Sequence, residues 1–287
     1  MIPLWLVVAA SAAAAVVQAP APAAVETIPL DLTGPRPIAM LAVGACEPVR
    51  VIFDTGASGN VLDADFARGA GLPDDGPAQV GTPAGGPPMI GFRTHIDNGR
   101  LGNAALAGAP AVALPMPALQ HLNVKGVMGP STFAGRLVFL DLAHGEIRVT
   151  PKTSATIPSG PSHAYQAAGP RSLPGVAVEI GGRSYDGHFD TGQPGMLMMP
   201  MTLAGEVPLE GALTDGPPAR LADGVPRAVR IGRIRGTVHV GGLVLTNPEV
   251  RFMEGLDRVN VGMLALRGST LVFDPAERRT WLIPPAG

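Results

Sequence analysis

Short apolar runs separated by turn-forming residues follow one another along most of the chain. Several of these runs alternate apolar with polar positions, which is the pattern of a strand with one buried face. Glycine or proline stands close to the ends of most runs, where a turn would connect two strands. The pattern predicts an all-β protein. The runs that predict strands are 28–32, 38–43, 49–53, 176–180, 185–189, 236–245 and 250–253.

Three segments depart from this pattern. Residues 63–69 suit one or two helical turns, whereas residues 208–230 are rich in turn-forming residues and predict a long loop. Residues 152–173 contain Pro, Ser, Gly and Ala without periodicity, which is typical of a linker. We therefore expect a boundary between two domains at 152–173.

The tetrapeptide Phe-Asp-Thr-Gly occurs twice, at 53–56 and at 189–192. Each copy follows an apolar run, so Asp54 and Asp190 are each expected at the tip of a turn that a buried strand supports. A single copy is as well explained by an Asp side chain that caps its own turn. Two copies in matched surroundings favour a pair of carboxylates that act together.

The segments that follow the two copies also correspond. The landmarks Gly129, Asp141 and Pro151 each recur 133 residues later, while the two motif Asp residues are 136 positions apart. A near-constant offset across separate landmarks indicates two copies of one module. The later landmarks are Gly262, Asp274 and Pro284.

Two neighbouring carboxyl groups can hydrolyse a peptide bond without a metal or a nucleophilic side chain. Held about 3 Å apart, they do not both ionise readily and therefore share a proton. One carboxylate can then accept a proton from water while its protonated neighbour donates one. Such a pair titrates as a unit, and the sequence assigns neither role to Asp54 or Asp190.

The paired motifs resemble those of the pepsin and retropepsin aspartic proteases. Asp-Thr-Gly-Ala-Ser at 54–58 follows an apolar run, and an apolar-apolar-Gly turn at 127–129 follows later, as in that family. The likeness covers most of residues 28–285 and is closest to bacterial, exported retropepsin-like proteins. It implies two pseudo-symmetric retropepsin-like β-barrel lobes, with the active site in the cleft between them. The expected lobes are 24–151 and 174–287.

The resemblance also implies a function and a set of site residues. The function is that of an aspartic endopeptidase, with Asp54 and Asp190 catalytic and with a peptide or protein as substrate. Both half-sites lie in one chain, so we expect an active monomer. The residues implied to support the pair are Thr55, Gly56, Thr191 and Gly192, and those implied to form a flap over the substrate are Gly81, Thr82, Gly85 and Gly86.

Two departures from the family keep an alternative open. Pepsin-like flaps carry a Tyr, whereas Tyr165 and Tyr185 lie elsewhere in this chain. Gln193 and Pro194 follow the second motif in place of the usual small or hydroxyl residues. The alternative is a catalytically inactive bilobal protein of the same fold that binds peptides or resembles an inhibitor. The intact Asp54 and Asp190 favour an enzyme.

Other residue types suggest no different chemistry. The methionine-rich tract 196–201 could bind Cu(I), but its position after a turn favours a core strand. His188 would share a strand face with Asp190 and, if charged, would favour the ionised carboxylate; its alternative is a purely structural role. The other histidines have no ligand spacing, and no motif for a serine nucleophile or a nucleotide is present. We expect no metal and no cofactor.

Composition and charge narrow the function further. The net charge is −2 and the basic residues are scattered, which argues against nucleic-acid binding. The single cysteine, Cys46, excludes an intramolecular disulfide and is expected as a buried thiol rather than a reactive one.

The amino-terminal segment has the features of an export signal. Residues 2–17 are apolar, and Ala21-Pro22-Ala23 has the small-x-small pattern of a cleavage site. We expect a signal peptide at 1–23, export to the periplasm, and no membrane association after cleavage. No lysine or arginine precedes the apolar run, so an uncleaved anchor is the alternative.

Overall fold

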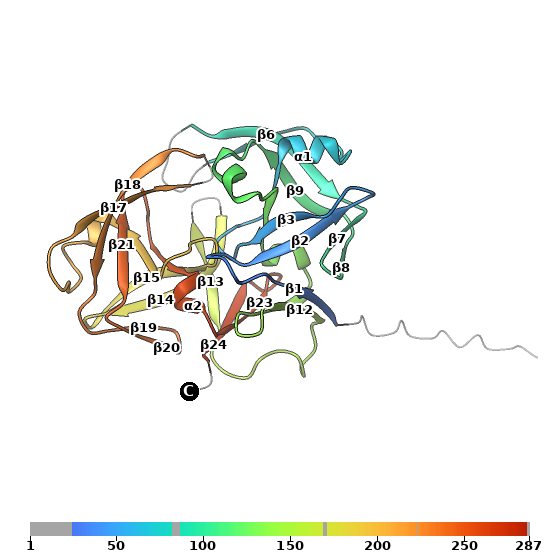
Figure 1. Cartoon of the computed structure of the whole chain (residues 1–287). Helices are drawn as coiled ribbons and strands as arrows, with labels where there is room; N and C mark the ends of the chain where they lie inside the picture. The colour runs from blue at the N-terminus through green and yellow to red at the C-terminus, as the bar shows by residue number, and fades with distance from the viewer. Residues whose placement is uncertain (1–24, 82–86, 169–170, 222, 286–287) are drawn as a thin grey trace, which may run out of the picture.

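The computed structural model describes residues 25–81, 87–168, 171–221 and 223–285. Most of them form β-strands, as the alternation of apolar and polar residues predicts (Figure 1). The predicted signal peptide and the flap residues Thr82, Gly85 and Gly86 lie outside the described residues. Within the described ranges, no helix is long and apolar enough to cross a membrane.

One sheet is built entirely from the first half of the chain. Its strands follow the order β5-β6-β9-β4-β10-β3-β2-β7-β8. They are β2 (Ile38–Val43), β3 (Val49–Phe53), β4 (Asn60–Asp63), β5 (Pro77–Val80), β6 (Met89–Ile96), β7 (Gly99–Leu101), β8 (Ala104–Leu106), β9 (Ala109–Leu114) and β10 (Gly126–Met128).

The second half repeats this order strand by strand. The path runs β17-β18-β21-β16-β22-β15-β14, and β19 and then β20 continue from β14. The internal repeat seen in the sequence is therefore also a repeat of topology. These strands are β14 (Arg171–Ile180), β15 (Arg183–Asp190), β16 (Leu197–Pro200), β17 (Thr214–Arg220), β18 (Pro226–Arg233), β19 (Thr237–Val240), β20 (Leu243–Thr246), β21 (Glu249–Met253) and β22 (Val259–Gly262).

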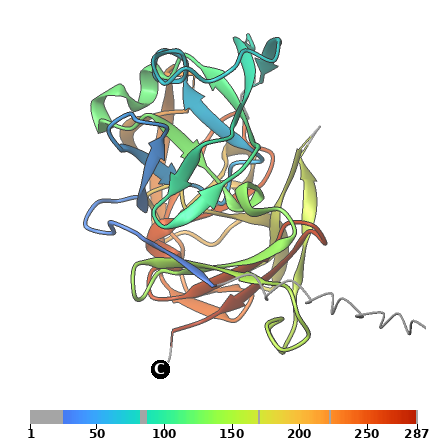
Figure 2. The ribbon, with the colours of Figure 1, turned by 90° about the vertical axis from the view of Figure 1, so that its right-hand side faces the viewer.

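A sheet shared by the two halves joins them. Its order is β1-β12-β11-β23-β24-β13, and the antiparallel pair β11–β23 crosses from one half to the other with Phe139 opposite Val272. Figure 2 shows its green strands from the first half beside its red strands from the second. The strands are β1 (Glu26–Pro29), β11 (Arg136–Asp141), β12 (Glu146–Pro151), β13 (His163–Ala168), β23 (Thr270–Asp274) and β24 (Arg279–Ile283).

Helices are short and lie between strands. The predicted helical turns at 63–69 are α1 (Ala64–Gly69), which begins after Asp63 because the Asp63 carboxylate accepts a hydrogen bond from the Phe66 N–H. The described residues also contain α2 (Met263–Leu266) and the 3₁₀ turns η1 (Pro117–Leu122), η2 (Pro130–Phe133) and η3 (Met201–Leu203).

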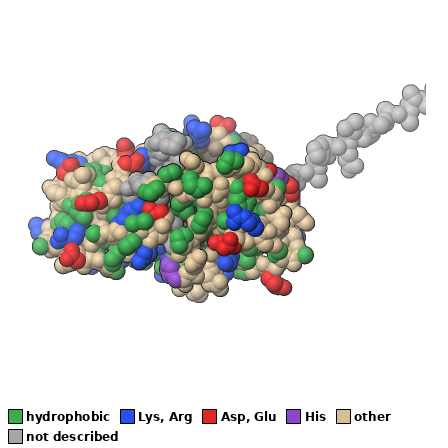
Figure 3. All heavy atoms as spheres, turned by 90° about the horizontal axis from the view of Figure 1, so that it is seen from above, with side chains coloured by type: hydrophobic (Ala, Val, Ile, Leu, Met, Phe, Trp, Pro, Cys, Tyr) green, Lys and Arg blue, Asp and Glu red, His purple; other side chains and the backbone are tan. Residues whose placement is uncertain are grey.

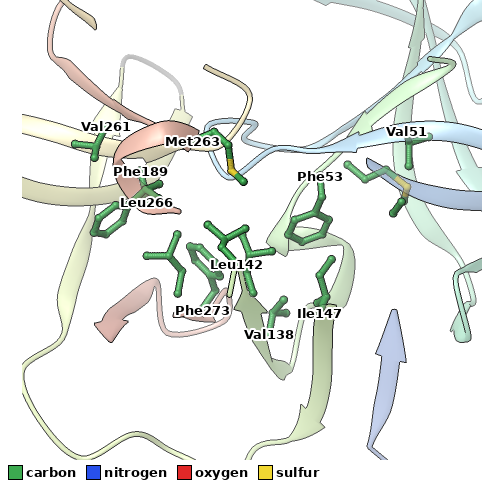
Figure 4. Packing of buried hydrophobic residues seen from close by; sticks show 14 of the residues in the cluster. Val51, Phe53, Val138, Leu142, Ile147, Phe189, Val261, Met263, Leu266 and Phe273 are labelled. Atoms are coloured by element: carbon green, nitrogen blue, oxygen red, sulfur yellow. The ribbon is translucent and has the colours of Figure 1, made fainter. Parts of the chain in front are cut away.

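A continuous apolar core runs beneath both Asp-Thr-Gly motifs. Phe53 and Phe189, each directly before a motif Asp, are fully buried, and Phe273 of the shared sheet lies between them (Figure 4). Burial of one such side chain stabilises the fold by about 1.5–3 kcal/mol. The core therefore anchors the strands that present Asp54 and Asp190.

The methionine-rich tract belongs to this core. Leu197, Met198 and Met199 are buried in β16, which confirms core packing as the main role of the tract. The expectation for Cys46 was wrong in part, because the residue is half-buried in the turn between β2 and β3.

Two predictions of irregular structure were wrong in part. Within 152–173, residues 163–168 form β13, which pairs with β24 and β14, and β14 begins at Arg171. Within 208–230, β17 pairs with β18 as a hairpin. Much of that hairpin is exposed on both faces, so it lacks the apolar alternation by which a strand is recognised.

Candidate active site

Each motif Asp lies at the end of a strand, and the neighbouring strands run in the same relative directions in both halves. In the first half, β10 runs parallel to β3 and antiparallel to β4, and the Asp54 N–H donates to the Met128 carbonyl at 2.8 Å. In the second half, β22 runs parallel to β15 and antiparallel to β16, with Gly262 opposite Asp190. Both carboxylates are thus presented by the same local topology.

Reciprocal hydrogen bonds join the two motifs. The Thr55 hydroxyl donates to the Phe189 carbonyl at 2.8 Å and accepts from the Thr191 N–H at 3.1 Å. The Thr191 hydroxyl donates to the Phe53 carbonyl at 2.7 Å and accepts from the Thr55 N–H at 3.1 Å. Both threonines, which the resemblance implied as support for the Asp pair, are fully buried.

The motif glycines let the two loops approach each other. A Cβ atom on Gly56 would lie 2.8 Å from Cγ of Asp190, and one on Gly192 would overlap the Asp54 carboxylate. Each glycine therefore packs against the Asp of the other motif, where any side chain would separate the loops. The structure brings together all six motif residues: Asp54, Thr55, Gly56, Asp190, Thr191 and Gly192.

The donors to the two carboxylates differ. Oδ1 of Asp54 accepts from the N–H groups of Gly56 at 2.7 Å and Gly192 at 3.2 Å. Oδ1 of Asp190 accepts from the Gln193 N–H at 3.0 Å, and its Oδ2 accepts from Nδ2 of Asn260 at 2.7 Å.

Two basic side chains, those of His188 and Arg36, lie near the two Asp residues. Nε2 of His188 is 3.8 Å from Oδ2 of Asp190, on the face that its position in the strand predicts. Nε of Arg36 donates to the Gly192 carbonyl at 2.6 Å. Burial lowers the pKa of Arg36, while Asp54 and Asp190 act in the opposite direction.

The carboxyl groups hold protons more strongly than isolated Asp residues. Burial, followed by the charge of Asp190, raises the pKa of Asp54 to about 7. Burial also raises the pKa of Asp190, although hydrogen bonds from Asn260 and Gln193 and the charge of Arg36 oppose this rise. At intermediate pH, the pair can therefore hold one proton and one negative charge.

The sequence analysis missed Asn260 and Arg36. Asn260 had a weak signal, since it is a polar residue two positions before the landmark Gly262, where the first half has Val127 before Gly129. Arg36 had none, because it stands alone between two prolines and contacts a residue 156 positions away.

The expected flap falls on the hairpin formed by β5 and β6. Of its four implied residues, Gly81 lies within the described residues, next to β5, and a Cβ atom there would meet open space. The β17–β18 hairpin takes the same place in the second half, and Figure 1 shows β6 and β18 on the same upper side of the molecule.

In the part of the chain that the structure describes, no group of three or more His, Cys, Asp or Glu residues could hold a metal ion. Acidic and basic side chains are interspersed over the face shown in Figure 3.

Comparison with known proteins supports a protease family. No curated protein matches the chain. A family model described as Aspartyl protease matches residues 39–132, which include the first Asp-Thr-Gly motif, β10 and the turn at Gly129. This part of the chain is similar to aspartyl proteases, and the match supports an aspartyl protease family and a hydrolase that acts on peptides or proteins.

Proposed function

We propose that this protein is an aspartic endopeptidase in which Asp54 and Asp190 together activate a water molecule. The observation that carries the proposal is the reciprocal threonine hydrogen bonding, which holds two identical Asp-Thr-Gly loops with each Asp against the glycine of the other loop. This geometry suits a pair that shares a proton.

The proposed mechanism uses one carboxyl group as a base and the other as an acid. The ionised carboxylate accepts a proton from the attacking water, while the protonated carboxyl donates its proton to the carbonyl oxygen of the scissile peptide bond. Addition of the water oxygen to the carbonyl carbon gives a tetrahedral intermediate. Proton transfer to the amide nitrogen then releases the amine and leaves a carboxylic acid.

The rest of the proposal concerns the setting of this reaction. The β5–β6 hairpin is a flap that closes over the bound peptide, and one chain is the active unit because it carries both motifs. The protein is exported, and its signal peptide ends at residue 23. Amino-terminal sequencing of extracytoplasmic protein should find a start near Ala24, whereas retention of Met1 in a membrane pellet would favour an anchor.

Cleavage of a mixed peptide pool by the purified protein tests the function. Asp54→Asn and Asp190→Asn should each lower kcat/KM by about 10²–10⁴-fold, since each removes one partner in proton transfer. Asp65→Asn is a matched control, because the Asp65 side chain is 98% exposed on α1. Product formation that persists unchanged in Asp54→Asn would refute the proposal.

Sedimentation tests the active unit separately. Active enzyme should sediment with the mass of one chain, and its specific activity should not fall on dilution. An active species of twice that mass, with activity lost on dilution, would show that a dimer is required.

A further inference from the structure

The two carboxylates differ in which of their oxygens accept hydrogen bonds. Both oxygens of Asp190 accept N–H donors, one from Gln193 and one from Asn260. Both N–H groups that reach Asp54 converge on Oδ1, and the described residues give its Oδ2 no N–H donor. Oδ2 of Asp54 is thus the oxygen better placed to carry the shared proton.

The donor from Asn260 selects the ionised form of Asp190. A side-chain NH₂ group can only donate, so its 2.7 Å contact with Oδ2 suits an oxygen that carries no proton. Hydrogen bonds to a charged group are also the stronger kind. Asn260 therefore favours negative charge on Asp190.

Arg36 acts in the same direction from the opposite half. It precedes β2, and its Nε donates at 2.6 Å to the carbonyl of Gly192, two residues after Asp190. The positive charge of Arg36 lowers the pKa of Asp190 against the effect of burial. The second motif is therefore held by a cation that the first half supplies.

The repeated topology shows that neither residue is required by the fold. Val127 takes the place of Asn260, because Val127 lies opposite Ile52 and Asn260 lies opposite His188, each two residues before a motif Asp. Ile38 and Gly175 lie opposite the same two residues, so Leu173 takes the place of Arg36.

We propose that Asn260 and Arg36 are positioning residues that keep the negative charge of the pair on Asp190, so that Asp54 holds the shared proton. The proposal rests on the proposed function for its catalytic meaning. It makes Asp190 the group that accepts a proton from water and Asp54 the group that donates to the peptide carbonyl.

The other titratable groups near Asp190 are Asp54, His188 and, beyond His188, Asp257. A charged His188 at 3.8 Å would also favour ionised Asp190. His188→Ile, which copies Ile52 of the first half, is therefore included as a separate variant so that its effect is not ascribed to Asn260.

The test titrates the carboxyl carbons of ¹³C-labelled Asp residues by NMR, with Asp54→Asn and Asp190→Asn used for assignment. The resonance of Asp54 should titrate near neutral pH, and that of Asp190 at lower pH. Asn260→Val should raise the titration midpoint of Asp190 by about one unit, and Arg36→Leu should also raise it. Asn260→Thr has the shape of Val but keeps a hydrogen-bond donor. Its Asp190 midpoint should therefore return most of the way to that of the unmodified protein.

Two results would overturn the inference. One is a near-neutral midpoint that belongs to Asp190 rather than Asp54. The other is an equal midpoint in Asn260→Val and Asn260→Thr, which would show that the amide acts only through packing. Because this readout does not require turnover, failure of the proposed peptidase function and failure of this proton assignment are distinguishable.

Kinetics provide a second measurement if the protein is a peptidase. Asn260→Val should move the acidic limb of the kcat/KM–pH profile upward by about one unit, and Asn260→Thr should return it. Val127→Asn places an amide at the corresponding position of the first half and should move the basic limb downward, because a donor near Asp54 favours loss of its proton. Unmoved limbs in all three variants would contradict the proposal.

Discussion

The two halves of the chain share one order of strands but differ in the side chains that surround their motifs. Backbone topology, buried threonines and close-packed glycines are the same on both sides. At four matched positions, the residue that belongs to the second motif or contacts it is polar or charged, whereas its counterpart is apolar. These pairs, with the apolar member first, are Ile52 and His188, Ala57 and Gln193, Val127 and Asn260, and Leu173 and Arg36.

The comparison separates what builds the site from what tunes it. Residues that occur in both halves bring the carboxylates together, so their replacement should damage either half alike. Residues that differ act on charge, and their replacement should change proton affinity more than structure.

The largest effect is expected from the shared threonines. Thr55→Val and Thr191→Val each remove reciprocal hydrogen bonds and leave buried backbone groups unpaired, so each should lower the free energy of unfolding by about 2–4 kcal/mol. Urea unfolding should show similar losses for both, with Thr246→Val on an exposed strand position as the control. A loss in one variant alone would mean that the halves do not depend equally on this contact.

A pH-dependent effect on stability is expected from Asp54. The pKa of Asp54 is raised to about 7 in the fold, so its contribution to stability is fully present below its unfolded pKa of about 4 and is lost as the pH rises through about 7. Asp54→Asn should flatten this decline and raise Tm at pH 8 relative to the unmodified protein. Thermal unfolding from pH 4 to pH 8 measures it, and equal slopes in both proteins would contradict it.

A smaller effect is expected from the β17–β18 hairpin. Its sequence lacks the glycine-rich stretch found at 81–86 in the first half. In the β17–β18 hairpin, the Arg227 guanidinium donates to both oxygens of Asp223, at 2.9 and 2.6 Å, and both side chains are largely buried. If this hairpin contacts the substrate, Arg227→Gln should raise KM by about two- to fivefold and leave kcat unchanged. Steady-state kinetics on one peptide measure this split, and an unchanged KM would remove the hairpin from substrate binding.

The smallest effect is expected at Ala57, the position after the first motif. Ala57→Ser adds a hydroxyl near Asp54, which should favour loss of the proton from Asp54 and shift the basic limb of the kcat/KM–pH profile downward by about 0.5–1 unit. Gly59→Ser adds a hydroxyl farther along the same loop, where a Cβ atom meets open space, and serves as the control. An upward shift in Ala57→Ser would show that another group sets the proton affinity of the pair.

The sequence predicts the repeated parts of this molecule well because each has a local signal. Apolar runs identified β2 and β3, and the position after a turn identified the core strand β16. The recurrence of Phe-Asp-Thr-Gly singled out the residues that meet between the halves. The offset of Gly129 and Gly262 indicated that this segment is repeated, although the sequence predicted a turn there and not the parallel strands β10 and β22 that lie beside the motifs.

The parts that the sequence did not predict depend on distant contacts. Asn260 reaches Asp190 because β22 pairs with β15 across 70 positions, and Arg36 reaches Gly192 across 156. No local pattern encodes either contact. Strand β13 escaped notice for a related reason, since its pairing with β24, rather than its own alternation, makes it a strand.

The shared sheet means that the peptide linkage between the halves need not be intact. Strands β1, β12 and β11 precede residue 152, and β13, β23 and β24 follow residue 162, so a cut between them leaves each fragment with its complete share of that sheet. Ser159 and Gly160 are exposed and outside any strand. Two fragments produced by a cut at this point should therefore reassemble as a heterodimer through the β11–β23 ladder. If the protein is the peptidase proposed above, each fragment alone should be inactive, and mixing the two should restore activity.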